Sequence, residues 1–85
     1  MEISLSQILG EVEYYLYYKH YDKLNLDFET KETKTQIKVI AYDCETGAII
    51  ETISLKKKEL LNDPLGIFEK FRALKEEAIQ GLNSA

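Results

Sequence analysis

The segment Thr35–Leu55, TQIKVIAYDCETGAIIETISL, decides the fold of this chain. Two runs rich in β-branched and aromatic residues, Ile37–Tyr42 and Ile49–Ile53, flank the linking residues DCETG at positions 43–47. Asp tolerates turn conformations, and Gly adopts a positive φ at no steric cost. Two such runs, separated by a short polar link that ends in Gly, predict a β-hairpin.

The residues just before the hairpin predict a third strand. Lys23–Thr30, KLNLDFET, alternates apolar and polar side chains, with Leu24, Leu26 and Phe28 on one face. Alternation with a period of two is typical of a half-buried strand. Residues 31–34 are polar and predict a turn into the hairpin. The three strands should therefore form an antiparallel meander, which needs only short connections.

A helix is predicted before the strands, over Met1–Tyr21. Ser4 and Gln7 fit a capping box, and apolar residues recur after them at helical spacing. Gly10 inside this run weakens a helix. The stretch Glu11–Tyr18, EVEYYLYY, is also rich in residues that favour strands, so a strand there is an open alternative.

After the strands, the sequence predicts one broken helix or two successive helices. Ser54 is placed to cap a short helix over residues 56–61, because its hydroxyl can accept a free backbone amide. Asp63 followed by Pro64 is a specific pair for the start of a second helix. That helix should end near Gln80, with Gly81 as its C-terminal cap.

These elements predict a single small α+β domain over residues 1–85: an N-terminal helix, a three-stranded antiparallel meander, and a C-terminal helix or helix pair. Both hairpin strands carry apolar residues on both faces, so either helices cover both faces or one face meets another chain. The expected core consists of Leu9, Val12, Leu16, Leu26, Phe28, Ile37, Val39, Ile49, Ile53, Leu61, Phe68, Phe71 and Ile79.

Composition excludes several classes of function. The net charge of −4 argues against a general binder of nucleic acid or anionic membranes. A single cysteine cannot form an internal disulfide, and no metal-ligand spacing is present. No apolar run is long enough to span a bilayer, and the first residues lack the basic stretch of a signal peptide. We therefore expect a cytoplasmic protein with no metal and no other cofactor.

No set of residues in the sequence suggests catalysis. His20 has no partner nearby in sequence to orient it as a general base, and is expected to be a surface histidine at a helix end. Cys44 lies between two acidic residues in the predicted turn, which disfavours a reactive thiolate. Glu11 and Glu13 are expected to be solvated charges, and the lysines at 56–58 are weak evidence for phosphate binding. We expect neither an enzyme nor a small-molecule substrate.

Tyrosines crowd the end of the first predicted helix and cannot all point inward. One interpretation is that these amphipathic rings lie along the surface with wet hydroxyls. The other is a protein contact, because Tyr is enriched at interfaces. We predict a homodimer or a tight complex with a protein partner, whose interface includes Tyr14, Tyr17, Tyr18 and Ile50.

Residues 24–61 resemble the bacterial flagellar FlaG family. That family has a strand with leucine and phenylalanine, a polar turn, a V-x-V-type strand, a D-x-x-T-G turn, a V-I-x-x-I run and a helix. The matching residues here are Leu24, Leu26 and Phe28; Ile37, Val39 and Ile40; Asp43, Thr46 and Gly47; and Ile49, Ile50 and Ile53. The resemblance implies a small non-enzymatic protein that takes part in flagellar filament assembly.

Two hypotheses for the function follow. The first is a protein-binding or assembly module of the FlaG type, associated with the flagellum. The second is a small acidic regulator or inhibitor, phage-encoded or antitoxin-like, that occupies a basic site on a protein partner. The second hypothesis is supported by the negative charge and the small size of the chain.

Overall fold

The computed structural model describes residues 2–83, so Met1, the first residue of the predicted helix, and residues 84 and 85 lie outside the described part. The strands form an antiparallel sheet in the order β1-β2-β3, which confirms the predicted α+β fold. The elements, in chain order, are α1 (Leu5–Lys19), β1 (Leu26–Glu32), β2 (Gln36–Asp43), β3 (Ile49–Lys56), α2 (Lys57–Asn62) and α3 (Pro64–Asn83).

Helix α1 begins with the predicted capping box. The Ser4 hydroxyl accepts the Gln7 amide at 3.2 Å, and the Gln7 side chain accepts the Ser4 amide at 2.8 Å. Ile8, Val12 and Leu16, spaced four residues apart, are 0–2% exposed and pack on the sheet. This spacing buries one side of a helix, so the strand alternative for residues 11–18 is wrong.

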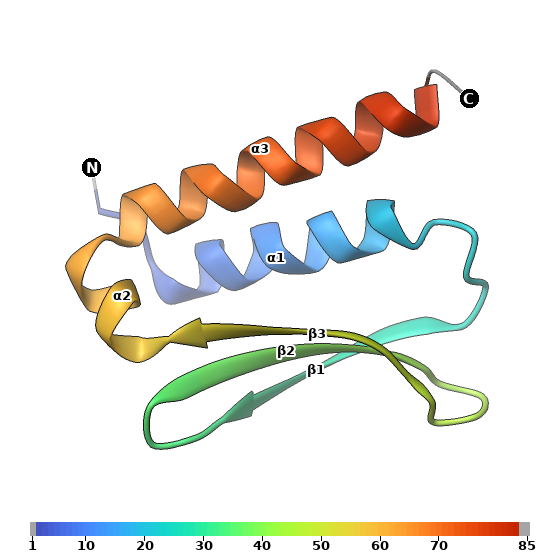
Figure 1. Ribbon diagram of the computed structural model, residues 1–85, viewed down its shortest axis with the longest axis horizontal. Coiled ribbons are helices and arrows are strands. Elements are labelled where there is room, and N and C mark those ends of the chain that lie inside the picture. Colours follow the sequence, from blue (N-terminus) through green and yellow to red (C-terminus); the bar gives the residue numbers. More distant parts are fainter. Residues whose placement is uncertain (1, 84–85) are drawn as a thin grey trace.

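The chain is arranged in three tiers: the sheet, then α1, then α3 (Figure 1). Helix α3 packs on α1, and Phe71, its one buried residue, has its ring 6.2 Å from that of Tyr15. Both helices lie on the same side of the sheet. The interpretation that helices cover both faces is therefore wrong, and the other face carries Tyr42 and Ile49 among charged residues.

A β-bulge between β2 and β3 changes which isoleucine faces the core. Ala41 pairs with Glu51 and Tyr42 pairs with Ile49, which leaves Ile50 as the extra residue. Side chains alternate across a strand, so one extra residue moves those beyond it to the other face. Ile49 consequently lies on the outer face and is 67% exposed. Its prediction as a core residue is wrong.

Most of the remaining predicted core residues are buried or half-buried, including Val12, Val39 and Phe71. The prediction of Leu61 as a core residue is wrong, because it projects from the short helix α2 and is 84% exposed. Leu24 is also misplaced: β1 begins at Leu26, so Leu24 lies in the preceding turn, 96% exposed.

The turn between β2 and β3 uses its residues as the sequence predicted. The Asp43 carboxylate accepts the amides of Glu45 at 2.8 Å and Thr46 at 3.1 Å. The Thr46 hydroxyl accepts the Ala48 amide at 3.2 Å, and Gly47 has a φ of 77°. This turn fixes the position of the hairpin, because its own side chains satisfy the backbone amides.

We expect Gly47→Ala to lower the free energy of unfolding by about 1–2 kcal/mol, because an L side chain is strained at positive φ. Urea denaturation measures the change. Gly81→Ala is the matched control, since a Cβ there meets nothing within 4 Å and the φ is ordinary. Equal stability of the two variants would contradict the role given to Gly47.

The ends of the C-terminal helices differ from the expectation at two residues. Ser54 lies inside β3, so it caps nothing, and α2 starts after Lys56 with no side-chain cap. Asp63 is confirmed as a cap, because its carboxylate accepts the Gly66 amide at 3.0 Å. Helix α3 runs through Gly81 to Asn83, so Gly81 is an internal residue and not the C-terminal cap.

Truncating Phe71 tests the packing of α3 on α1. We expect Phe71→Ala to lower the free energy of unfolding by about 3–5 kcal/mol, because it leaves a cavity between the helices. Leu61→Ala, at an exposed apolar position, should change it by less than about 0.5 kcal/mol. An unchanged urea midpoint for Phe71→Ala would mean that α3 does not depend on this contact.

Candidate protein-binding surface

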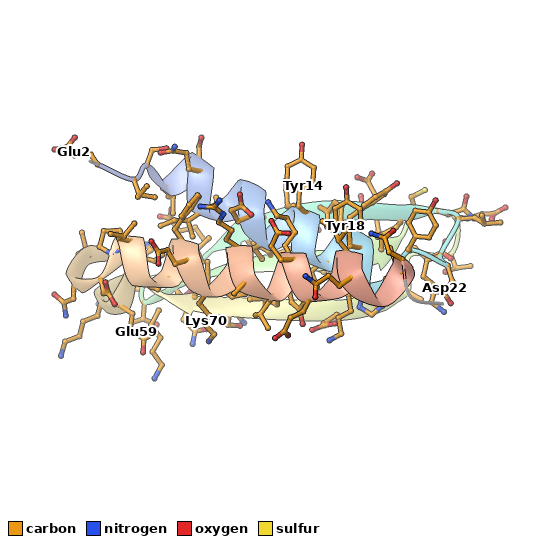
Figure 2. The ribbon with its side chains drawn as sticks, turned by 90° about the horizontal axis from the view of Figure 1, so that it is seen from above. Glu2, Tyr14, Tyr18, Asp22, Glu59 and Lys70 are labelled. Atoms are coloured by element: carbon orange, nitrogen blue, oxygen red, sulfur yellow. The ribbon has the colours of Figure 1, made fainter. Side chains whose placement is uncertain are left out.

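The uncovered side of α1 carries a row of exposed tyrosines. Tyr14 and Tyr17, three residues apart, lie on one side of α1, and Tyr21 continues the row in the turn that follows the helix. They are 58%, 44% and 58% exposed, and Leu24 continues the row. We call these four residues the tyrosine surface. Figure 2 shows Tyr14 projecting outward from α1.

Tyr17 is the centre of this row. Its ring lies 5.2 Å from that of Tyr18 and 6.0 Å from that of Tyr21, at interplanar angles of 80° and 89°. Edge-to-face pairs of this kind are favourable beyond the area they bury. The rings therefore support one another on a helix that is itself fixed to the sheet.

A shallow hollow lies on each side of Tyr17. The first, of about 370 Å³, is lined by Gly10, Glu13, Tyr14, Tyr17 and Phe28. The second, of about 330 Å³, is lined by Tyr17, Tyr21, Lys23, Leu24 and Leu26. We call them the Gly10 hollow and the Lys23 hollow. Tyr17 thus forms a ridge between two recesses, a shape that can interlock with a partner.

An ion pair between the helices supports Tyr14. Lys75 of α3 places its ammonium 2.8 Å from a carboxylate oxygen of Glu11, and both side chains are less than 20% exposed. That oxygen is buried, and the contact is too poorly aligned to be a hydrogen bond. The same ammonium lies 5.9 Å from the centre of the Tyr14 ring. The expectation that Glu11 is a solvated charge is therefore wrong.

Of the four predicted interface residues, Tyr14 and Tyr17 belong to the exposed row. Tyr18 is half-buried beside Tyr17, and Ile50 is half-buried at the bulge in β3. The Gly10 and Lys23 hollows border β1, whereas β3 is the opposite edge of the sheet, so Ile50 does not join them. The sequence analysis placed Leu24 in a strand and so missed it as a surface residue. The polar residues of the run Tyr21–Lys23 were the available signal that a turn precedes the strand.

His20 and Lys19, at the end of α1, meet Glu51 of β3. His20 Nε2 lies 2.7 Å from one Glu51 oxygen, and Lys19 Nζ lies 2.9 and 3.1 Å from the two oxygens. His20 lies at the end of α1 as predicted, as its C-cap, but its side chain is only 18% exposed, so its prediction as a surface histidine is wrong. His20 and Glu51 are 31 residues apart in the sequence, so their contact links the end of α1 to β3 and helps to hold α1 on the sheet.

The pKa of Glu51 reports this contact. Partial burial raises the pKa of the carboxyl group, but hydrogen bonds from Lys19 and His20 outweigh that effect, and the pKa is lowered overall. The pKa of Lys19 is raised, chiefly by its hydrogen bond to Glu51. Both directions mean that the folded state favours the charged forms.

We expect acid to remove the stabilisation by Glu51. A carboxyl whose pKa is lowered by folding stabilises the protein above its unfolded pKa, and this is lost as pH falls through the folded pKa. The free energy of unfolding should therefore fall below pH 4.5, the ordinary value for glutamate, and fall less in Glu51→Gln. Chemical denaturation from pH 3 to pH 7 measures both. Glu29→Gln, at an exposed position in β1, is the control and should lose stability in acid as the unmodified chain does. If Glu51→Gln loses as much stability between pH 7 and pH 3 as the unmodified chain, Glu51 does not stabilise the fold in this way.

Other candidate residues form no site for chemistry in the described part of the chain. Cys44 is exposed in the β2–β3 turn, as predicted. Lys57 pairs with Glu32 at 3.0 Å, beside an apolar groove of about 490 Å³ between the start of α1, the start of β2 and α2. Residues 2–83 contain no group of three side chains arranged to hold a metal.

No helix among the described residues is long and apolar enough to cross a membrane. No protein-family model, no curated protein and no solved structure matches this chain. The tyrosine surface and the resemblance of residues 24–61 are therefore the features that bear on its function.

Proposed function

We propose that this chain is a small, non-enzymatic protein-binding or assembly module of the flagellar FlaG type, made in the cytoplasm, that binds its partner through the tyrosine surface. The observation that carries the proposal is the row of exposed tyrosines, with Tyr14 and Tyr17 on the uncovered side of α1 and Tyr21 in the turn after it. Tyr supplies a large, rigid contact area with only two side-chain torsions to fix.

The surface has the features of a binding site for a protein. Its rings are held by contacts with one another and by the Lys75–Glu11 pair, so little conformational entropy is lost when a partner binds. Hollows on both sides of Tyr17 offer recesses for partner side chains. Aromatic anchors beside such recesses are where binding energy concentrates.

The flagellar part of the proposal is supported by the resemblance. Its D-x-x-T-G residues form the hairpin turn, and its apolar residues largely build the sheet. The residues that the chain shares with the family thus specify the sheet that holds α1, while the tyrosines lie outside residues 24–61. Tyrosine variants should therefore impair partner binding and leave the fold intact.

Deleting the gene in the source organism tests the function. We expect filaments of altered length or number, restored by the unmodified chain and not by a chain carrying Tyr14→Ser and Tyr17→Ser. Tyr42→Ser, on the other face of the sheet, is the matched control and should restore filaments. Circular dichroism should show both variants folded.

Unchanged filaments after deletion, or a source organism without flagella, would contradict the flagellar assignment. The alternative, an acidic regulator of a basic partner, predicts binding that weakens steeply as salt increases. A partner contact dominated by the tyrosine rings would instead weaken with Tyr17→Ser and depend little on salt.

A further inference from the structure

The chain has more surface than its mass requires. Its accessible surface is 5926 Å², whereas a compact monomer of 9.9 kDa has about 5,200 Å². The radius of gyration is 13.3 Å, against about 12 Å for a compact chain of this length. The excess of about 700 Å² follows from the thin shape of the chain, which leaves flanks that a second chain could cover.

The two hollows beside Tyr17 carry opposite charges. The Gly10 hollow contains Glu13, and the Lys23 hollow contains Lys23. Neither side chain has an ion-pair partner among residues 2–83. The tyrosine surface thus has an acidic recess on one side of Tyr17 and a basic recess on the other. When a second copy is rotated by 180° to face the first, the basic recess of each copy lies opposite the acidic recess of the other.

Gly10 and Leu24 give the two recesses complementary shapes. A Cβ added at Gly10 would meet no neighbouring atom within 4 Å, so the Gly10 hollow is open over this part of the helix. Leu24, at the rim of the Lys23 hollow, is 96% exposed and has little apolar contact within its own chain. An exposed apolar side chain such as Leu24 can be buried in the Gly10 hollow of another copy.

We propose that the tyrosine surface binds a second copy of this chain, with the two α1 helices antiparallel about a two-fold axis that passes beside Tyr17. In this arrangement the Gly10 hollow of each copy faces the Lys23 hollow of the other. Glu13 of each copy meets Lys23 of the second copy, and Leu24 of the second copy enters the Gly10 hollow. A two-fold contact forms each interaction twice, as closed dimers require. The inference rests on the proposed use of this surface for protein binding and names its partner.

Filling the Gly10 hollow tests the shape of the contact. Gly10→Leu should raise the dissociation constant of the dimer by at least about tenfold, because the added side chain occupies the recess. The same change improves helix propensity, so the fold itself should not be weakened. Gly81→Leu, at an equally open helical position in α3, should leave the dimer unchanged. Sedimentation equilibrium measures the dissociation constant, and urea denaturation the fold.

Reversing the two charges tests the orientation. Glu13→Lys and Lys23→Glu should each raise the dissociation constant by about tenfold, because like charges then face one another. The double variant should return it close to that of the unmodified chain, since each pair is restored with the signs exchanged. A parallel arrangement, which sets Glu13 against Glu13 and Lys23 against Lys23, does not predict this recovery.

The outcomes separate this inference from the proposed function. A chain that stays monomeric at high micromolar concentration overturns the dimer, while loss of filament function in the tyrosine variants would still support binding to another protein. A dimer that Tyr17→Ser weakens but Gly10→Leu and the charge reversals do not would overturn the antiparallel arrangement. A dimer insensitive to all of these changes overturns the use of this surface.

Discussion

Helix α1 has to pack against two elements at once, and the rest of the structure depends on this. Ile8, Val12 and Leu16 bury one side of it on the sheet, while Tyr15 and Glu11 meet α3 on an adjoining side. A three-stranded sheet needs cover on one face to be stable. Because α3 packs on α1 rather than on the strands, the position of α3 depends on that of α1.

The consequence is a thin chain with an uncovered flank. Its extents are 35 × 30 × 14 Å, because each tier is one helix or one narrow sheet wide (Figure 1). One side of α1 is left without cover, and Tyr14 and Tyr17 lie on it. Tyr suits such a position, since its ring tolerates partial burial while its hydroxyl stays in water. The same property makes it effective when a partner removes the water.

Two polar contacts hold α1 in this middle tier. Glu51 reaches it from β3 through Lys19 and His20, and Lys75 reaches it from α3 through Glu11. Glu51 faces the helix because Ile50, the extra residue of the bulge, precedes it in the chain, so residues 51, 53 and 55 keep the alternation that places them on the inner face. The bulge therefore exposes Ile49 and leaves Glu51 on the inner face, where it meets α1. Neither pairing is visible in the sequence, since its members are separated by more than 30 residues.

The sequence by itself determined the elements whose causes are local. The capping box at Ser4, the turn from Asp43 to Gly47 and the start of α3 at Asp63 depend on side chains that bond to backbone within three residues, so their residue types suffice to predict them. Tyr14 and Tyr17 were likewise placed on an outer face by helical spacing alone.

Only the tertiary structure decided features that depend on contacts between distant segments. The bulge exposed Ile49, and the packing of α3 on α1 left one face of the sheet without helices. The tertiary structure also separated Ile50 from the tyrosines and brought Leu24 beside them. Periodicity assigns a side chain to a face of its own element. Which faces meet is set by the register and by the way the elements pack, and those are properties of the whole fold.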